Sequence, residues 1–355
     1  MLSLLLHWIR CLIEFIQKWV RQRTGKVITL DSGRKVSLGK QLAEGGFSFV
    51  FEAFDENNAL YAMKRIHCPD QEILEGCRRE IAVHRAVQHP NVMPLFGSAV
   101  QGDACFMLFP YCPNSLRSMV NQTNPLLNQS LILKEQPWDD VFVLNLFYQV
   151  CSGVQALHDH GFSHRDIKLE NVLLSASQQK PLLMDFGSTG PLERRIEGRR
   201  DVLEVVEQAA QHTTLPYRSP ELFDGVLRVG DELDYRAVDV WSLGCVLFAI
   251  LYGSSPFECE FVRSSGHLKI IEASHLSVLG PIPKPKVHPV SKWYAPEIRT
   301  HLIEPLLVQD RFQRLRLGDI MKTTQQLIVQ FGGTVGASNS FHDEGEGIAL
   351  MSRVV

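Results

Sequence analysis

The residues with the clearest chemistry form one short run, His164-Arg165-Asp166-Ile167-Lys168-Leu169-Glu170-Asn171, followed by Asp185-Phe186-Gly187. Phosphoryl transfer requires a carboxylate that orients the attacking hydroxyl group, and oxygen ligands that hold Mg²⁺ on the phosphates. Asp166 suits the first task, and Asn171 and Asp185 suit the second. Each residue alone is as easily explained as a turn or cap residue, so the prediction depends on the whole combination.

This combination resembles the eukaryotic protein kinase family, over about residues 36–332. The resemblance implies ATP as phosphate donor, Mg²⁺ as cofactor and protein hydroxyl groups as acceptors. It also implies that Lys64 binds the α- and β-phosphates and pairs with Glu80 on the following helix. Lys168, two residues after the catalytic Asp166, follows the pattern of serine/threonine kinases and would neutralise charge on the transferred phosphate.

By the same resemblance, four further residues support the site without taking part in the chemistry. Thr214 is expected to bond to the aspartate and the lysine of the catalytic loop. Glu221 is expected to form a buried ion pair with Arg314. Asp239 is expected to brace the backbone of the catalytic loop.

The nucleotide-binding loop departs from the family pattern G-x-G-x-x-G-x-V, because only the middle glycine is kept, at Gly45. Backbone N–H groups bind the phosphates, so small residues can replace glycine where the backbone dihedral angles are ordinary. Adenine would bond to backbone groups that follow Phe109, the expected gatekeeper. The residues that the resemblance assigns to nucleotide binding are Leu42, Ala43, Glu44, Gly45, Gly46, Phe47, Ser48, Val50, Lys64, Pro110 and Cys112.

Three functions are compatible with these motifs. Intact Lys64, Asp166, Asn171 and Asp185 favour a serine/threonine protein kinase that transfers the γ-phosphate of ATP to protein hydroxyls and also autophosphorylates. The altered glycine loop would agree with a pseudokinase scaffold that binds partners at a membrane surface. A small-molecule kinase would share the fold, but the segment around Thr214 favours a protein substrate.

A narrower resemblance is to the Numb-associated kinase family. It rests on Glu44-Gly45-Gly46-Phe47-Ser48, on Met184-Asp185-Phe186-Gly187-Ser188, and on the segment from Glu197-Gly198 to Gln211. Members of that family carry an extra helix in the activation segment. Residues 201–211 fit such a helix, because apolar residues recur there at helical spacing: Val202, Val205, Val206 and Ala209.

Hydrophobic periodicity places strands early in the chain and helices later. Strands are predicted at Val36–Glu44, Phe49–Phe54, Leu60–Ile66 and near 92–98 and 103–109, and helices at 71–87, 138–160 and 237–252. This order is typical of an α+β protein. With the resemblance, it predicts the bilobal protein kinase fold, with a small β-rich N-lobe and a larger helical C-lobe over residues 36–332, followed by a flexible tail at 333–355.

Residues 1–40 carry eight basic and two acidic side chains, 8 − 2 = +6, in a chain of net charge −3. Polar residues recur at helical spacing within residues 1–20 and leave a wide apolar face that includes Trp8 and Trp19. Three charges argue against a transmembrane helix. We interpret residues 1–30 as an amphipathic helix and basic linker, whose residues 1–26 bind an anionic membrane surface. Docking on the protein's own surface, or on a second copy, remains the alternative.

The rest of the composition is that of a soluble protein, with 45% hydrophobic and 21% charged residues. The net charge gives no general attraction to nucleic acid, so no nucleic-acid partner is expected. Eight cysteines without a CxxC pair indicate reduced thiols. These features favour a cytoplasmic protein, peripheral on a cytosolic membrane face that is Golgi or endosomal by analogy with the family it resembles.

Overall fold

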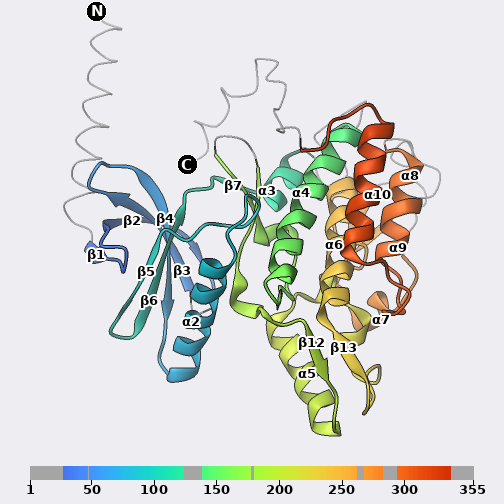
Figure 1. Cartoon of the computed structure of the whole chain (residues 1–355), viewed down its shortest axis with the longest axis horizontal. Helices are drawn as coiled ribbons and strands as arrows, with labels where there is room; N and C mark the ends of the chain where they lie inside the picture. Colours follow the sequence, from blue (N-terminus) through green and yellow to red (C-terminus); the bar gives the residue numbers. More distant parts are fainter. Residues whose placement is uncertain are drawn as a thin grey trace, which may run out of the picture.

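The computed structural model describes residues 27–46, 48–123, 138–176, 180–261, 268–282 and 294–336. A sheet formed early in the chain lies beside a larger helical part formed later (Figure 1). This α+β arrangement confirms the predicted bilobal fold. The predicted N-terminal helix over residues 1–26, and the part of the predicted tail beyond residue 336, lie outside the described residues.

The N-terminal lobe is built on an antiparallel sheet with the strand order β1-β2-β3-β4-β6-β5. Lys64 on β4 pairs with Val50 on β3 and with Met107 on β6. Directly paired residues of antiparallel strands face the same side of a sheet, so these three side chains share a face. The strands are β1 Val27–Thr29, β2 Lys35–Glu44, β3 Ser48–Asp55, β4 Leu60–His67, β5 Gly97–Gln101 and β6 Ala104–Pro110.

The strand predicted near 92–98 is wrong in its bounds, because β5 begins only at Gly97. The apolar residues before it contact the C-terminal lobe instead. Met93 N–H donates to the carbonyl of Leu183 at 2.9 Å, and Val92 forms a bridge with the same residue. Burial between the lobes therefore accounts for the apolar pattern that resembled a strand.

The predicted linker over residues 1–30 overlaps β1. Ile28 is fully buried and Leu30 is 3% exposed, both in a hydrophobic cluster under the sheet with Met63 and Phe106. Residues 27–30 therefore belong to the catalytic domain. Their exposed and buried positions alternate in the structure, which is the period of a strand rather than of a linker.

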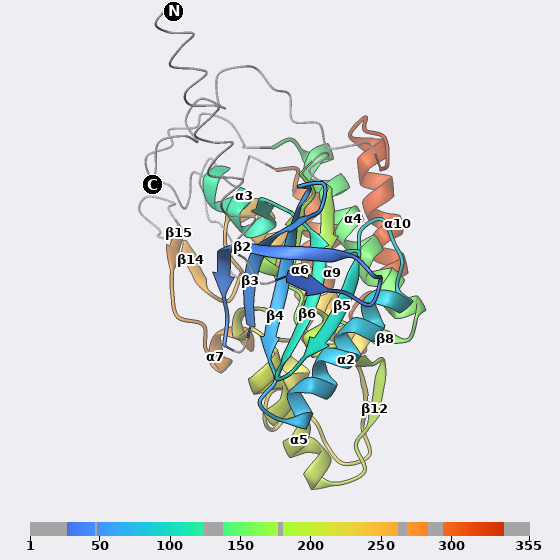
Figure 2. The ribbon, with the colours of Figure 1, turned by 90° about the vertical axis from the view of Figure 1, so that its left-hand side faces the viewer.

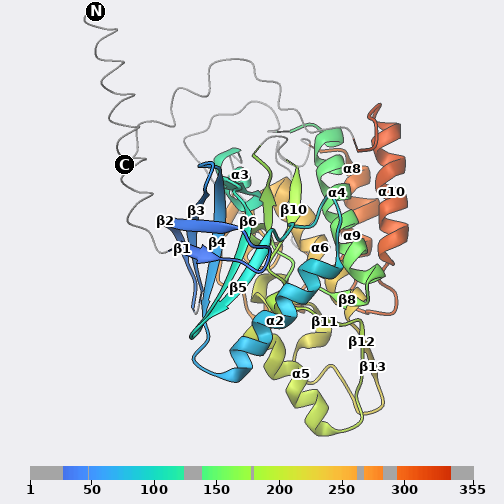
Figure 3. The same ribbon diagram turned by 60° about the vertical axis from the view of Figure 1, so that its left-hand side comes forward.

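Helix α2, Gln71–Ala86, lies between the sheet and the helical lobe (Figure 1). Its first turn is capped by Asp70, whose carboxylate accepts a hydrogen bond from Ile73 N–H at 2.9 Å. Figure 3 shows the helix running alongside β5. Cys77 and Ile81 pack with Met107 and other apolar side chains of the sheet in one cluster, which fixes the direction of the helix face that carries Glu80.

The C-terminal lobe is organised around α4 and α6, which confirm the helices predicted at 138–160 and 237–252. Both are long and apolar enough to cross a membrane, but they are largely buried in one hydrophobic core, as in a soluble protein. Around them lie shorter helices. The helices of this lobe are α3 Leu116–Thr123, α4 Asp140–Asp159, α5 Arg199–His212, α6 Tyr235–Tyr252, α7 His275–Val278, α8 Pro296–Ile298, α9 Glu304–Leu306 and α10 Leu317–Gln330.

Short strands and turns carry the segments between these helices. Helix α5 confirms the helix predicted at 201–211, and Figure 2 shows it at one end of the molecule beside β12. The strand pairs place the two loops with chemical motifs close together, because β8 and β9 flank one loop and pair with β11 and β10, which flank the other. The strands are β7 Asn114–Ser115, β8 Phe162–Ser163, β9 Val172–Leu174, β10 Pro181–Leu183, β11 Gly190–Pro191, β12 Glu193–Arg195, β13 Glu232–Asp234, β14 Cys259–Phe261 and β15 Leu268–Ile270.

The first residues of the predicted flexible tail are held against α4. Gly336 N–H donates to Asn145 Oδ1 at 2.9 Å. A Cβ on Gly333 would lie 2.3 Å from the side chain of Val141, so the backbone approaches the helix closely. The tail prediction is therefore wrong for residues 333–336, which belong to the catalytic domain.

Candidate active site

Lys64 joins three segments that are far apart in the sequence. Its Nζ lies 2.8 Å from Glu80 Oε1 on α2 and 2.9 Å from Asp185 Oδ1, which follows β10. The predicted pair between Lys64 and Glu80 is confirmed. Because the ammonium group contacts both lobes, it couples the position of α2 to that of the loop at Asp185.

The charges of this cluster stabilise one another. Burial opposes the ammonium form of Lys64, but the carboxylates of Glu80 and Asp185 outweigh it, so its pKa is raised. Lys64 in turn holds the pKa of Asp185 below its usual value. Burial raises the pKa of Glu80 against the attraction of the same ammonium. The buried lysine is therefore a fixed cation.

Asp166 lies in a second cluster, formed by the catalytic loop and the segment at Thr214. Lys168 Nζ donates to Asp166 Oδ2 and to Thr214 Oγ1, both at 2.8 Å. The hydroxyl and the N–H of Thr214 donate to Asp166 Oδ1 at 2.8 and 2.9 Å. Asn171 Nδ2 donates to the carbonyl of Asp166 at 2.8 Å. The bonds predicted for Thr214 are confirmed, and they fix the orientation of the Asp166 carboxylate.

Asp239 on α6 holds the backbone of this loop through hydrogen bonds. Its carboxylate accepts hydrogen bonds from His164 N–H at 2.8 Å and Arg165 N–H at 2.7 Å, which confirms the predicted brace. His158 Nε2 lies 2.8 Å from the same carboxylate. Although burial opposes ionisation, these bonds keep the pKa of Asp239 below its usual value. Arg165 has φ of 71°, so the loop includes a left-handed residue that needs such support.

Asp185 also has a left-handed backbone, with φ of 67°. The following residue, Phe186, is buried and packs against two histidine rings. Its ring centroid lies 4.5 Å from that of His84 on α2 and 5.6 Å from that of His164. This packing holds the strained turn, and with it the carboxylate of Asp185, in one conformation.

The predicted glycine loop joins β2 to β3 opposite Lys64. Ala43 pairs with Val50, and Val50 pairs with Lys64, so these three residues form one row across the sheet. Gly45 N–H donates to the carbonyl of Ser48 at 2.7 Å. Ala43 and Ser48 have negative φ, since the positive-φ residues other than glycine are Asn58, Arg165 and Asp185 among those described. The backbone there accommodates side chains without strain. Leu42, Glu44 and Gly46 complete the described part of the loop, and Phe47 lies outside it.

A protein kinase domain model matches residues 36–325. This chain belongs to the protein kinase family. Curated relatives include serine/threonine-protein kinase 16 of Rattus norvegicus and of Homo sapiens, each 35% identical over 242 residues, which is 66% of this chain and 75% of the relative. A probable serine/threonine-protein kinase of Dictyostelium discoideum is 27% identical over 363 residues, 84% of this chain and 95% of that protein. The chain is a serine/threonine protein kinase.

The kinase has two side-chain oxygens suited to Mg²⁺. Asn171 uses its amide nitrogen to bond Asp166, which leaves its carbonyl oxygen free of those bonds. Asp185 bonds Lys64 through Oδ1, which leaves Oδ2. Among the described residues, no cluster of three or more His, Cys, Asp or Glu side chains is arranged as a metal site. Two oxygen ligands fit Mg²⁺, which usually takes one or two protein ligands and completes its shell with phosphate oxygens and water.

The segment predicted to contact adenine follows β6. Phe109 is 8% exposed, and its ring centroid lies 5.0 Å from that of His84. Pro110 ends the strand in register with Tyr61, and Cys112 follows it, partly buried. Strand β6 therefore ends at the point where the prediction places the nucleotide base.

The predicted ion pair between Glu221 and Arg314 anchors the C-terminal end of the activation segment. Arg314 Nη1 and Nη2 donate to the two carboxylate oxygens of Glu221 at 2.8 and 3.1 Å, and both side chains are essentially buried. Within the same segment, Val205 and Ala209 of α5 pack in a hydrophobic cluster with Tyr235 and neighbouring residues. Both contacts hold the activation segment against the C-terminal lobe.

Two residues near the site had not been singled out from the sequence. His84, one turn beyond Glu80 on α2, is 1% exposed, and its Nδ1 donates to the carbonyl oxygen of Met93 at 2.9 Å. Arg117 on α3 contacts Glu170 of the catalytic loop. The spacing of four between Glu80 and His84 could have indicated the first, because it places both on one helix face. Nothing in the sequence connects Arg117 with Glu170.

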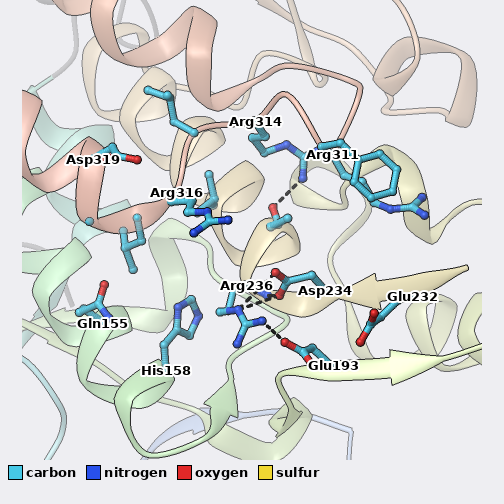
Figure 4. Close-up of a pocket in the computed structure, with 16 residues that line it drawn as sticks. Gln155, His158, Glu193, Glu232, Asp234, Arg236, Arg311, Arg314, Arg316 and Asp319 are labelled. Carbon is cyan, nitrogen blue, oxygen red and sulfur yellow. Dashed lines mark hydrogen bonds and ion pairs between the residues drawn. The ribbon is translucent and has the colours of Figure 1, made fainter.

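A separate pocket of about 810 Å³ lies in the C-terminal lobe, between α4, β12, β13, α6 and the start of α10 (Figure 4). Its charged side chains are largely paired, as Arg236 is with Glu193 and Asp234. The predicted catalytic residues do not line it. The pocket is therefore separate from the Lys64 and Asp166 clusters.

Proposed function

We propose that the kinase transfers the γ-phosphate of ATP to serine and threonine hydroxyls of proteins, with Asp166 as the base and Lys64, Glu80 and Lys168 as the other catalytic residues. The observation that supports these roles is that the Lys64 cluster and the Asp166 cluster lie on adjoining loops, because Met184 N–H, next to Asp185, donates to the carbonyl of Asn171 at 3.0 Å. Lys64 contacts Glu80 and Asp185 within 2.9 Å, and Lys168 contacts Asp166 at 2.8 Å. The same enzyme is proposed to autophosphorylate.

Asp166 has the features of a base that orients a substrate hydroxyl. Thr214 and Lys168 hold both of its oxygens, so the carboxylate is aligned before the substrate arrives. A hydroxyl within about 3 Å of a carboxylate oxygen can pass its proton to it as the phosphoryl group is transferred. The ammonium of Lys168 lies beside this position and would offset the negative charge of the phosphoryl group.

Lys64 would bind the α- and β-phosphates, since its amine is a fixed cation between Glu80 and Asp185. The described loop residues Leu42–Gly46, Ser48 and Val50 would cover the nucleotide, and backbone groups of Pro110 and Cys112 would bond adenine. Asn171 and Asp185 would hold Mg²⁺, which when bound neutralises phosphate charge. Small-residue replacement in the loop leaves backbone N–H groups in place, so this arrangement is compatible with ATP binding.

An in vitro assay with γ-labelled ATP and generic protein substrates tests the proposal. Lys64→Met and Asp166→Asn should each lose about 10²-fold or more in kcat, roughly 3 kcal/mol of barrier, while keeping the fold. Acid hydrolysis of the product identifies whether Ser and Thr carry the label. Equal labelling by wild type and Asp166→Asn would refute the assigned base. Nucleotide binding without any transfer by the wild type would favour the pseudokinase scaffold.

We also propose that residues 1–26 attach the kinase to an anionic membrane on its cytosolic side, Golgi or endosomal by analogy. The support is the sequence itself, with a wide apolar face, two Trp residues and a basic run from 21 to 26. The full chain should sediment with phosphatidylserine vesicles and less with neutral ones. Trp8→Ser with Trp19→Ser should reduce sedimentation. Full-chain protein that stays in the supernatant with both vesicle types would refute the proposal.

A further inference from the structure

Arg117 contacts four groups of the protein, although its side chain is close to the surface. It is the second residue of α3, and its side chain is 19% exposed. Its Nε donates to Glu170 Oε1 at 2.8 Å, its Nη2 to the Tyr217 hydroxyl at 2.9 Å, and its Nη1 to the carbonyl of Gly253 at 3.1 Å. A second carboxylate, that of Glu258, lies 3.5 Å from Nη2. One guanidinium thus joins four separate segments.

Two of these partners, Glu170 and Tyr217, lie on the segments that orient Asp166, which the acceptor hydroxyl must approach. Glu170 lies in the turn Leu169–Asn171, which directly follows Lys168, and Lys168 bonds Asp166. Tyr217 ends the turn that follows Thr214, which also bonds Asp166. A polypeptide that presents a hydroxyl to Asp166 therefore passes close to Glu170 and to the guanidinium of Arg117.

Arg117, Glu170 and Glu258 form a cluster that we call the corner, and its negative charges outnumber its positive charge. Glu170 and Glu258 supply −2 and Arg117 supplies +1, so the corner has a formal charge of −1, and it would have −2 without the arginine. Glu258 is fixed by hydrogen bonds from Ser254 Oγ at 2.8 Å and Ser255 N–H at 3.0 Å. Two carboxylates held at one place are a natural site for a guanidinium or ammonium group, since bonds between ionised partners are strong.

We propose that Arg117 determines peptide selectivity by occupying this carboxylate pair in place of a basic substrate residue. The wild-type kinase then does not select Arg or Lys at positions that flank the acceptor Ser or Thr. Removal of the guanidinium opens an acidic subsite, and the selectivity changes toward basic peptides. The inference concerns the substrate class of the kinase reaction and adds no new chemistry.

A merely structural role for Arg117 would be to tie α3 to the catalytic loop. Loss of that tie would lower stability and the rate with all peptides alike. Selectivity separates the two roles, because only an opened acidic subsite favours basic peptides over neutral ones. The sign of the change is therefore diagnostic even where absolute activity falls.

The test uses the full chain and a peptide library in which each position within four residues of a fixed Ser or Thr is varied. Wild type is compared with Arg117→Met, which keeps the apolar stem and removes the charge. The matched control is Arg299→Met, since Arg299 is 18% exposed and forms its ion pair with Glu304, at 3.1 Å, and not with Glu170 or Glu258. The double variant Arg117→Met, Glu170→Gln tests whether the carboxylate causes the change.

Wild type and Arg299→Met should show no enrichment of Arg or Lys at flanking positions. Arg117→Met should gain about tenfold in relative kcat/KM for Arg over Ala at one or two of them, the effect of one charge-assisted hydrogen bond. The Glu170→Gln change should remove most of that gain. Strong selection of a flanking basic residue by wild type, or an unchanged profile in folded Arg117→Met, would overturn the proposal. Absence of all phosphorylation by wild type would instead refute the assigned activity.

Discussion

The buried ion pair between Glu221 and Arg314 offers the sharpest test of how the activation segment is anchored. Arg314 donates to both oxygens of Glu221, to the carbonyl of Ala237 at 2.6 Å and to that of Val308 at 3.1 Å. Its guanidinium also lies 5.1 Å from the ring centroid of Trp241. Every partner is therefore supplied by the protein, and the side chain of Arg314 is 0% exposed.

Glu221→Ala should be strongly destabilising, because it leaves this cation buried with only two carbonyl acceptors. Removing one partner of a buried ion pair costs about 3 to 5 kcal/mol. At roughly 2 °C per kcal/mol for a domain of this size, Tm should fall by about 6 to 10 °C. Glu221→Gln keeps one acceptor oxygen, so its loss should be smaller, about 2 to 3 kcal/mol.

Thermal unfolding monitored by circular dichroism, with denaturant titration as a check, measures these changes. The surface pair Arg78–Glu75 is the comparison, and Glu75→Ala should change stability by less than about 1 kcal/mol because the two side chains are 54% and 50% exposed. The double variant Glu221→Ala, Arg314→Met should be more stable than the sum of its single changes predicts, since it leaves no unpaired charge. A loss below about 1 kcal/mol for Glu221→Ala, or strict additivity, would refute the reasoning.

The remaining predictions concern pH, packing and the catalytic loop. Burial lowers the pKa of His84 from 6.5 to about 4, so the protein takes up a proton on unfolding between these pH values. The contribution of His84 to stability is complete above pH 6.5, and stability should fall by up to about 3 kcal/mol as the pH approaches 4. His84→Leu should flatten this slope in pH-dependent melts, and an unchanged slope would exclude His84 as its source. Gly153→Ala should destabilise the protein by about 1 to 3 kcal/mol, because the new Cβ would lie 2.7 Å from the Asn91 carbonyl oxygen. Gly318→Ala, whose new Cβ would have no atom within 4 Å, should stabilise it by up to about 1 kcal/mol. Equal effects of the two changes in thermal melts would contradict this. Thr214→Ala should lower kcat about tenfold while Thr214→Ser retains most activity, and equal steady-state rates for both would show that the hydroxyl is dispensable.

Much of the site follows from local sequence because its parts are close in the chain. Asp166, Lys168 and Asn171 lie within one loop, so a motif of fixed spacing carries their relation. The assignment of Lys64 and Glu80 needed the resemblance to a family, since neither a lysine on a strand nor a glutamate on a helix is unusual. Strands and helices with strong periodicity were predicted at nearly their observed bounds, as for α4 and α6.

The errors fall where burial comes from another part of the chain. The apolar residues at 92–93 are covered by Leu183 of the other lobe, and Gly333 and Gly336 are held by α4. In each case the prediction explained the sequence pattern by the segment's own secondary structure or flexibility, whereas contacts with a distant segment explain it. Periodicity reports which side of an element is covered, but not what covers it.

The sequence by itself determined the class of this protein, the candidate residues for phosphoryl transfer and the order of its elements, because these are properties of spacing along the chain. Only the tertiary structure decided which groups meet across it. Arg117 lies beside Glu170, and His84 lies beside Phe186, because α3 and α2 pack against the catalytic and Asp185 loops. Contacts between residues so far apart depend on how whole elements pack, and that information is spread over the entire core.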